Sequence, residues 1–450
     1  MQVLEFILGK SKFVLVALVI LLIAQSILGR PKSYYYPVYA LMGLYIILLM
    51  LNYFELLSMG PTLARGLVGV AIFLLSSSVF LFFAFPVEKL PIPSGEFKMG
   101  TRIYELEDKK RLENYTEDKN DKRRLKYQVW YPAQSTQNYK KEKWIDDGTV
   151  LTRQLAKTMH MPAFVLDHTA QIDSNSYLNA PVNNSLDKYP LVVISHGWKG
   201  FREIHTDYAE ELASNGYIVV SIDHTYGSQA VKFNDGKVAY LNKKALPRIA
   251  KATEYARISN LLVVTYGEDV ASVLDDLERV NRTDTILKGK IDLDKIGTLG
   301  HSTGGAGAVY IALKDNRIKA LMGLDAWLKP IASEIKGGLI IPSLFLRSEQ
   351  WSKGPNNISL YHLLNLSDHA SLVELSKTNH VDFSMSYMYS PITKYIGFTG
   401  KLGGRVSSEI QRKLILSFFD HNLKNNSQSN EDYLLDILNK EDNLSMVDRW

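Results

Sequence analysis

The chain of 450 residues contains no cysteine. This absence excludes a disulfide framework, a metal site built on cysteine thiolates and a thiol nucleophile, and it leaves the redox compartment open. An excess of charge of either sign is also missing, because the formal net charge is only +5. Nucleic acid is therefore not an expected partner. The balance of 46% hydrophobic and 22% charged residues excludes intrinsic disorder and a purely membrane-embedded protein.

Charge is missing altogether from three stretches near the amino terminus. Residues 13–29, 33–54 and 66–87 carry no charged side chain and are 17, 22 and 22 residues long. A helix rises about 1.5 Å per residue and the hydrocarbon core of a bilayer is about 30 Å thick, so the two longer stretches can span it. The shortest needs its flanking Lys12 and Arg30 to snorkel. The pattern predicts transmembrane helices at about 13–29, 34–54 and 66–87.

Two other interpretations of these stretches were weighed. A cleavable signal peptide could account for the first, because Ala24-Gln25-Ser26 resembles a small-residue cleavage site, but two more apolar stretches follow closely. Buried helices of a soluble domain would show a polar face, which these stretches lack. Lysine and arginine barely discriminate the orientation, with three on one side of the spans and four on the other.

The apolar region ends at a run of helix-breaking residues. Pro91, Pro93 and Gly95 cannot continue a helix, and they divide a membrane region (1–87) and a linker (88–103) from a large domain at 104–450. The first part of this domain reads as a solvated, highly charged loop at 104–126, a strand at 125–130 and a helix over 144–166.

Beyond Tyr189 apolar strands alternate with helices. Strands are expected at 191–194, 217–223, 295–300, 319–324, 339–346 and 369–375, and helices at 208–215, 243–280 and 412–423. Continuous apolar strands separated by helices are typical of a mainly parallel sheet covered on both faces. The predicted fold class is therefore α/β.

One motif carries chemistry. Gly300-His301-Ser302-Thr303-Gly304 follows an apolar strand and precedes a helix start rich in small residues. This is the context of a nucleophile elbow, in which the serine occupies a strained turn and the glycines at 300 and 304 let strand and helix pass closely. Because Thr303 opens the helix, its backbone N–H points to the same space as the Ser302 hydroxyl.

A serine nucleophile needs a base, and four histidines follow it in the chain. His421 lies in an amphipathic helix, while His362 and His369 precede the last strand or begin it. His380 follows that strand, and catalytic groups of open α/β sheets gather at the carboxyl ends of strands. We therefore expect His380 to be the base. Earlier histidines, among them His196, are expected to be structural.

The base needs a carboxylate to orient it, and two acids are in position. Asp325 follows the strand at 319–324, and Glu349 follows the strand at 339–346. Both lie at the catalytic edge and both precede His380. The residues alone leave the choice open.

The motifs together resemble the platelet-activating factor acetylhydrolase family of the plasma, secreted type, across roughly residues 90–425. The matching segments are Leu90-Pro91-Ile92-Pro93-Ser94-Gly95, Val129-Trp130-Tyr131-Pro132-Ala133, Ser195-His196-Gly197 with Gly200-Phe201-Arg202, Gly300-His301-Ser302 with Gly304-Gly305, Leu324-Asp325-Ala326-Trp327 with Pro330, and His380-Val381-Asp382-Phe383. The resemblance implies an α/β-hydrolase fold. It also assigns the acid to Asp325 and makes Glu349 a pocket or structural residue.

The resemblance further implies calcium-independent hydrolysis of short or oxidised acyl esters on phospholipids, with an oxyanion hole formed by the backbone amides of Trp198 and Thr303. We accordingly expect a membrane-anchored serine ester hydrolase without metal or cofactor, acting on an ester or phospholipid at a lipid bilayer, with its domain outside the cytoplasm. Three alternatives were considered: a carboxylesterase or polyester hydrolase for other esters, a catalytically inactive interaction module, and a membrane sensor or transporter. No charge interrupts the spans, so no ion path is visible.

Overall fold

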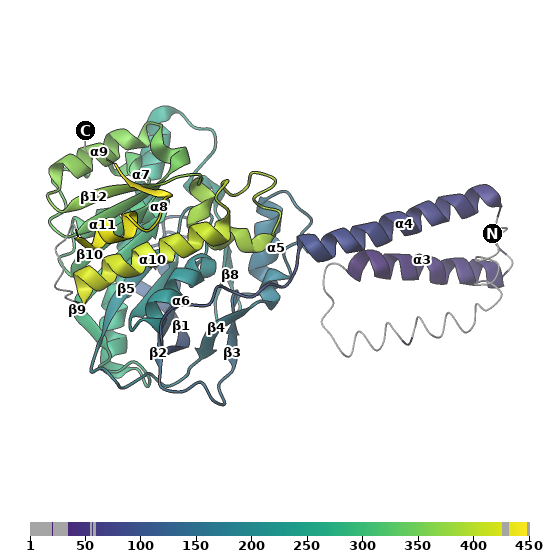
Figure 1. The fold of residues 1–450 in the computed structure, drawn as a ribbon, viewed down its shortest axis with the longest axis horizontal. Coiled ribbons are helices and arrows are strands. Elements are labelled where there is room, and N and C mark those ends of the chain that lie inside the picture. Colours follow the sequence, from purple (N-terminus) through teal and green to yellow (C-terminus); the bar gives the residue numbers. More distant parts are fainter. Residues whose placement is uncertain (1–19, 21–34, 55, 57–59, 425–431, 448–450) are drawn as a thin grey trace.

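The computed structural model describes residues 20, 35–54, 56, 60–424 and 432–447. Two apolar helices, α3 (Tyr36–Tyr53) and α4 (Pro61–Ala84), pack against each other and project from the large domain (Figure 1). The helix predicted at 13–29 lies outside the described residues apart from Ile20.

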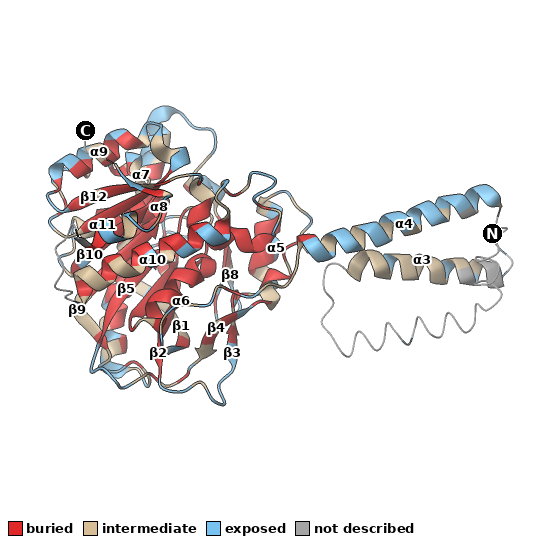
Figure 2. Ribbon diagram, viewed as in Figure 1, coloured by how far each residue is buried: buried red, intermediate tan, exposed pale blue. Residues whose placement is uncertain are grey.

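The described residues contain one helix that is long and apolar enough to cross a membrane. This helix is α4, with a mean hydropathy of 2.5 and with only 6% of its most apolar window buried. Figure 2 shows that most of its length is exposed. Helix α3 has 18 residues, which corresponds to about 27 Å of rise and lies at the lower end of the lengths that cross a hydrocarbon core. The prediction of three spans is not supported, because α4 is the single candidate span among the described residues.

The large domain is built on one sheet of eleven strands in the order β13-β12-β11-β10-β9-β5-β6-β2-β1-β4-β3. Strands β6, β5, β9, β10, β11 and β12 are parallel, and β2 joins β6 antiparallel. The strands are β1 (Lys98–Leu112), β2 (Lys122–Ala133), β3 (Lys141–Lys143), β4 (Asp173–Leu178), β5 (Tyr189–Ser195), β6 (Ile218–Asp223), β9 (Ile291–His301), β10 (Ile318–Leu324), β11 (Ser343–Ser348), β12 (Ala370–Leu375) and β13 (Leu444–Met446); β7 (Ala230–Lys232) and β8 (Val238–Tyr240) form a separate hairpin.

Helices cover both faces of this sheet. Helices α6 (Thr206–Ser214), α10 (Gly404–Leu423) and α11 (Asp432–Leu438) contribute to the apolar core on one face. Helices α7 (Ala252–Thr283), α8 (Thr303–Ala312) and α9 (Asn356–Leu366) contribute to the cores on the other. The strands between them are buried on both sides, as Figure 2 shows, and every residue of β5 and β6 is buried. This arrangement confirms the predicted α/β class.

Helices α7 and α8 approach unusually closely. A Cβ atom placed on Gly267 would lie 2.9 Å from the carbonyl oxygen of Gly307, and one on Gly307 would lie 2.9 Å from the Cβ of Tyr266. The small residues that open α8 therefore let α7 lie directly against it. This contact fixes the helix that follows Ser302.

Four local predictions differ from the structure. The charged stretch 104–126 is mostly the antiparallel pair β1 and β2 rather than a solvated loop, because the charged residues of β1 lie at half-buried or exposed positions, whereas Arg123 and Lys126 of β2 are buried in ion pairs. Strand β1 also begins at Lys98, within the predicted linker 88–103. Only α5 (Thr149–Thr158) is an α-helix in the predicted helix 144–166. Helix α7 begins at Ala252 rather than near 243, since Pro247 interrupts the segment before it.

Candidate active site

Ser302 lies on a sharp turn between β9 and α8. Its backbone has φ 56° and ψ −118°, a conformation that L residues rarely adopt. A Cβ atom on Gly300 would lie 2.4 Å from the carbonyl oxygen of Gly304, and one on Gly304 would lie 2.2 Å from that of Ser195. Only glycine fits at these two positions. The turn pushes the Ser302 side chain out of the sheet edge, as an elbow requires.

The structure brings three of the predicted residues into hydrogen-bond contact. Ser302 Oγ lies 2.9 Å from Nε2 of His380, and Nδ1 of the same ring lies 3.0 Å from Oδ2 of Asp325. Asp325 follows β10, and His380 begins the short helix η7 (His380–Phe383) after β12. Three chain segments thus meet at the carboxyl ends of parallel strands.

The Asp325 carboxylate is fully buried and firmly held. The backbone N–H of Ser348 donates to its Oδ1 over 2.8 Å, and the Ser348 hydroxyl donates to Oδ2 over 2.6 Å. Glu349, the alternative acid, is exposed, and its carboxylate accepts from the backbone N–H of Lys377 over 2.6 Å. In this arrangement His380 contacts Asp325, and Glu349 holds the turn that leads toward His380.

The imidazole of His380 is fixed by its neighbours. The ring of Trp351 stacks on it with 4.3 Å between ring centroids and an angle of 3° between the planes. The side chain of Gln350 accepts from its backbone N–H over 2.9 Å, and Nε2 of His301 lies 3.1 Å from its carbonyl oxygen. Stacking and backbone contacts therefore hold the ring between Asp325 and Ser302.

Two backbone amides close to Ser302 in the chain or in the cavity wall make no hydrogen bond among the described residues. In the described part of the chain, the amides of Trp198 and Thr303 donate to no protein acceptor. Thr303 is the first residue of α8, and Trp198 lies in the loop after β5. A Cβ atom on Gly197 would lie only 2.9 Å from the Cβ of Ser302, so the loop backbone passes directly beside the nucleophile. Two free donors are available there for a developing oxyanion.

Buried polar residues hold the loop that carries Trp198. Nδ1 of His196 lies 2.7 Å from the carbonyl oxygen of Gly197, and its Nε2 lies 2.8 Å from the hydroxyl of Ser228. At the far end of the loop Arg202 is fully buried and pairs with the carboxylate of Asp223. Burial alone would lower the pKa of Arg202, but the surrounding carboxylates outweigh it and raise this pKa, so the guanidinium stays charged.

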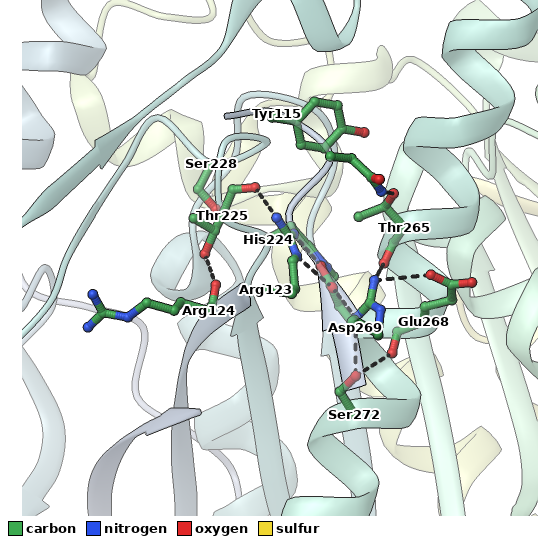
Figure 3. A network of polar contacts seen from close by, with 12 residues as sticks. Tyr115, Arg123, Arg124, His224, Thr225, Ser228, Thr265, Glu268, Asp269 and Ser272 are labelled. Carbon is green, nitrogen blue, oxygen red and sulfur yellow. Dashed lines mark hydrogen bonds and ion pairs between the residues drawn. The ribbon is translucent and has the colours of Figure 1, made fainter. Parts of the chain in front are cut away.

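A second buried network continues behind this loop (Figure 3). The hydroxyl of Ser195 lies 2.7 Å from Nε2 of His224, whose Nδ1 lies 3.0 Å from Asp269. Arg123 donates to both carboxylate oxygens of Asp269, over 3.0 and 2.6 Å, and to Glu113 over 2.8 Å. The serine, histidine and aspartate repeat the pattern at Ser302, but all three are 0% exposed, so no substrate reaches them. The network joins the end of β5 to helix α7.

The histidines around the site are neutral. Burial lowers the pKa of His205 to about 3 and lowers that of His196 well below its usual value. The pKa of His301 is lowered mainly by burial and further by His380. Neutral neighbours add no positive charge beside His380, which leaves Asp325 as the charged group next to its ring.

A cavity of about 330 Å³ opens in front of Ser302. Ser302, His380, Gly197 and Trp198 line it, and most of the exposed area of its wall is apolar. The apolar side chains are Leu155, Met159, Phe201, Ile204, Val381, Tyr389 and Phe398, and further polar ones are Thr158, Lys199, Gln229, His301, Ser384 and Ser386. This volume is at the small end of the range for ligand pockets, and an apolar wall with few convergent polar groups suits a small acyl group.

The arrangement contains the parts of nucleophilic catalysis: a hydroxyl, a base, an orienting carboxylate and two free amides. Sequence analysis missed the groups that support them, chiefly Ser348, Trp351 and Asp269. Ser348 is the last residue of β11 and Trp351 lies just after it, and their proximity to the candidate Glu349 was the only signal that could have identified them.

Comparison with known proteins gives a family match over most of the chain. A family described as platelet-activating factor acetylhydrolase, isoform II, matches residues 83–441. Platelet-activating factor acetylhydrolase from Bos taurus is 29% identical over 53% of this chain and 58% of its own length. The protein of the same name from Canis lupus familiaris is 26% identical over 66% of this chain and 71% of its own length. The chain thus spans a little over half of the length of the cattle protein.

A solved structure shares the fold. The ferulic acid esterase from Streptomyces cinnamoneus superposes with a TM-score of 0.62 over 80% of this chain and 99% of its own, at 20% sequence identity. At this identity the likeness concerns the fold alone. It agrees with the α/β-hydrolase fold that the sequence resemblance implied.

Proposed function

Since the chain belongs to the platelet-activating factor acetylhydrolase, isoform II family, we propose that it is a membrane-anchored serine ester hydrolase that cleaves short or oxidised acyl esters of phospholipids. The hydrogen-bonded series from Ser302 through His380 to Asp325 is the observation that carries this proposal. A relative from Arthroderma benhamiae, 27% identical over 31% of this chain, is named a probable 1-alkyl-2-acetylglycerophosphocholine esterase.

The mechanism follows from these contacts. Nε2 of His380 takes the proton of the Ser302 hydroxyl as the oxygen attacks the ester carbonyl, and Asp325 stabilises the imidazolium that forms. The amides of Trp198 and Thr303 donate to the negative oxygen of the tetrahedral intermediate. The imidazolium then protonates the departing alcohol and leaves an acyl group on Ser302. Water, activated by His380, hydrolyses this acyl-enzyme and restores the hydroxyl.

The small cavity supports a short acyl chain as the group transferred to Ser302. Its volume of about 330 Å³ and apolar wall fit a short chain better than a long one. A wider carboxylesterase activity remains the competing function. Comparing p-nitrophenyl esters of two, four, eight and sixteen carbons tests the two functions. We expect kcat/KM to fall steeply beyond the short chains, whereas a flat profile would contradict the acyl-length proposal.

The Ser302→Ala variant tests the nucleophile. Removing this single oxygen should lower the kcat for p-nitrophenyl acetate by about 10⁶-fold and abolish labelling by a fluorophosphonate probe. The matched control is Ser135→Ala, which alters an exposed serine outside the cavity. Residual labelling or turnover near the wild-type level in Ser302→Ala would refute the assignment.

Membrane anchoring is proposed through α4. This helix has 24 residues, about 36 Å of rise, and it exposes large apolar side chains such as Ile72 and Phe73, at 61% and 69%. Its end is docked to the domain, where the Ser390 hydroxyl donates to the carbonyl oxygen of Ala84. We place the domain on the extracytoplasmic side, where protease added to intact cells would remove it.

Extraction of the full chain from membranes tests the anchor. The wild-type chain should stay in the membrane pellet in alkaline carbonate and dissolve only in detergent. An Ile72→Arg change places a charge in the helix at a cost of about 2.5–3.5 kcal/mol and should increase the carbonate-soluble fraction. Ile72→Leu is the control at the same position. Complete release of the wild-type chain by carbonate would contradict the anchor.

A further inference from the structure

A second cavity of about 460 Å³ adjoins the catalytic one, and we call it the basic cavity. Five cationic side chains line it: Lys157, Lys199, Lys243, Lys244 and Arg248. No aspartate or glutamate is among its lining residues. The chain as a whole has nearly equal numbers of basic and acidic residues, 52 and 47, so a wall with charge of one sign is a local feature.

These cations come from three separate chain segments. Lys157 lies in the last turn of α5, Lys199 lies in the loop next to Trp198, and the others follow β8 in the segment interrupted by Pro247. Lys199 has a φ of 68°, a strained backbone conformation for this residue type. The fold therefore directs positive charge from three segments into one space.

The positive charges are not neutralised within the protein. In the part of the chain that the structure describes, none of the five side chains forms an ion pair. Burial lowers the pKa of Lys199, and the neighbouring charges of Arg248 and Lys243 lower it further. Like charges held close together without a counter-ion repel one another. An anion in the basic cavity would remove this repulsion.

The basic cavity is continuous with the catalytic site. Thr158, Trp198 and Lys199 line both cavities. Trp198 also supplies one of the two amides proposed to bind the oxyanion. A substrate whose ester carbonyl lies against this amide therefore has its remaining atoms within reach of the lysines. In a glycerophospholipid the phosphate is separated from the ester by only a few bonds.

We infer that the basic cavity binds the phosphate of the substrate, and that the substrate class is an acidic glycerophospholipid whose headgroup carries no positive charge. This inference rests on the proposed ester hydrolysis at Ser302 and adds the headgroup to it. Lysine and arginine are the usual partners of phosphate oxygens.

A choline headgroup, which the name of the Arthroderma benhamiae relative gives for that protein, fits this cavity poorly. A quaternary ammonium has no N–H to donate and is bound by aromatic faces or by carboxylates. Apart from the imidazole of His160, the basic cavity has one aromatic residue, Trp198, and it has no carboxylate, so its five cations would repel a sixth positive charge. The lining thus discriminates against choline by repulsion as well as favouring phosphate by attraction.

Binding of uncleavable lipids tests the inference without depending on turnover. The probes are short-chain dialkyl ether phosphatidic acid and the corresponding phosphatidylcholine, used as monomers with the full chain in a non-ionic detergent. Ether linkages replace both esters, so neither lipid is cleaved. We expect the phosphatidic acid to bind at least about 10-fold more tightly at low salt, and the difference to shrink as salt screens the charges.

Charge removal tests the location. Lys243→Gln combined with Arg248→Gln removes two exposed cations from the basic cavity, and we expect the ratio of the two affinities to fall by about 10-fold. The matched control removes two exposed lysines outside both cavities, Lys188→Gln with Lys336→Gln, and should keep the wild-type ratio.

Each outcome decides the inference. Equal binding of the two lipids, or an unchanged ratio in the cavity variant, would overturn it. Inorganic phosphate is the third probe, and binding of phosphate alone as tightly as phosphatidic acid would identify a site for the free ion and also overturn the lipid assignment. Hydrolysis of p-nitrophenyl acetate, measured on the same preparation, reports on Ser302 separately. Loss of turnover with selective lipid binding intact would refute the proposed function and keep the cavity assignment.

Discussion

The choice between the two candidate acids can be decided by substituting each with its amide. In Asp325→Asn, the backbone N–H of Ser348 can only donate, and it lies 2.8 Å from Oδ1. The asparagine must therefore turn its oxygen toward Ser348 and its NH₂ group toward Nδ1 of His380, which lies 3.0 Å from Oδ2. An NH₂ group facing Nδ1 forces the proton onto Nε2, next to the Ser302 hydroxyl. The ring can then no longer accept the hydroxyl proton.

The expected loss for Asp325→Asn is about 10⁴-fold in kcat, the magnitude found for the same change in a serine protease triad. The KM should change little, because Asp325 does not line the catalytic cavity. Glu349→Gln is the matched variant. Its side chain accepts from the Lys377 amide, and a glutamine oxygen can accept there too, so kcat should stay within about 3-fold. Steady-state hydrolysis of p-nitrophenyl acetate measures both variants, and a larger loss in Glu349→Gln would refute the assignment.

Two predictions concern stability. Asp269→Asn removes one of the two charged partners of the buried Arg123 guanidinium, and it should lower the free energy of unfolding in urea by about 3–5 kcal/mol. The control is Asp275→Asn, which breaks an exposed ion pair on the same helix and should cost less than about 1 kcal/mol. Equal losses in the two variants would contradict the role of the network. The pKa of His205 is about 3 in the folded chain and about 6.5 in the unfolded chain. The contribution of the neutral ring to the free energy of unfolding is therefore fully present above about pH 6.5 and is lost as the pH falls toward 3. Between pH 7.5 and 5 this loss amounts to about 2 kcal/mol, which His205→Phe should remove; an unchanged pH dependence in that variant would contradict the shift.

The parts of the fold that could be predicted are those with a local signal. The strands expected at 191–194 and 217–223 are confirmed by β5 and β6, because continuous apolar runs mark strands buried on both faces. The strand and helix around Ser302 were likewise evident, since an elbow needs glycine at fixed offsets. The strand expected at 125–130 lies within β2, whereas β1 was missed because charged residues fill much of it and suggested a solvated loop.

The membrane helices show how far composition alone can predict. A charge-free stretch indicates only that a segment is tolerated in lipid, and it does not fix where a helix begins or ends. Helix α4 starts at Pro61, five residues before its charge-free stretch, whereas α3 starts at Tyr36, three residues after the beginning of its own. Helix boundaries depend on turns and capping residues that a charge count does not include.

The positions of the site residues were easier to predict than their contacts. The ends of β10 and β11 lie side by side at one edge of the sheet, which explains why Asp325 and Glu349 were equivalent in sequence. The distinction arises from Ser348, whose amide and hydroxyl both hold Asp325, and from the turn at Lys377, which engages Glu349. A contact between residues 23 or 28 positions apart depends on the register of two strands and has no local pattern. The assignment of catalytic roles therefore stays a prediction.

The same reasoning explains why the sequence did not reveal which residues hold the loop that carries Trp198. Arg123 and Asp269 are 146 residues apart, and His224 and Asp269 are 45 apart. None of these residues touches the cavity, yet they tie α7 to the end of β5, from which the loop with Trp198 starts. A backbone donor stabilises a developing charge only if its position is fixed before the reaction. The buried ion pairs can supply that rigidity, because separating two charges away from water leaves each without a partner and costs free energy. The buried pair of Arg123 and Asp269 therefore restrains the end of β5, where the loop that carries Trp198 begins.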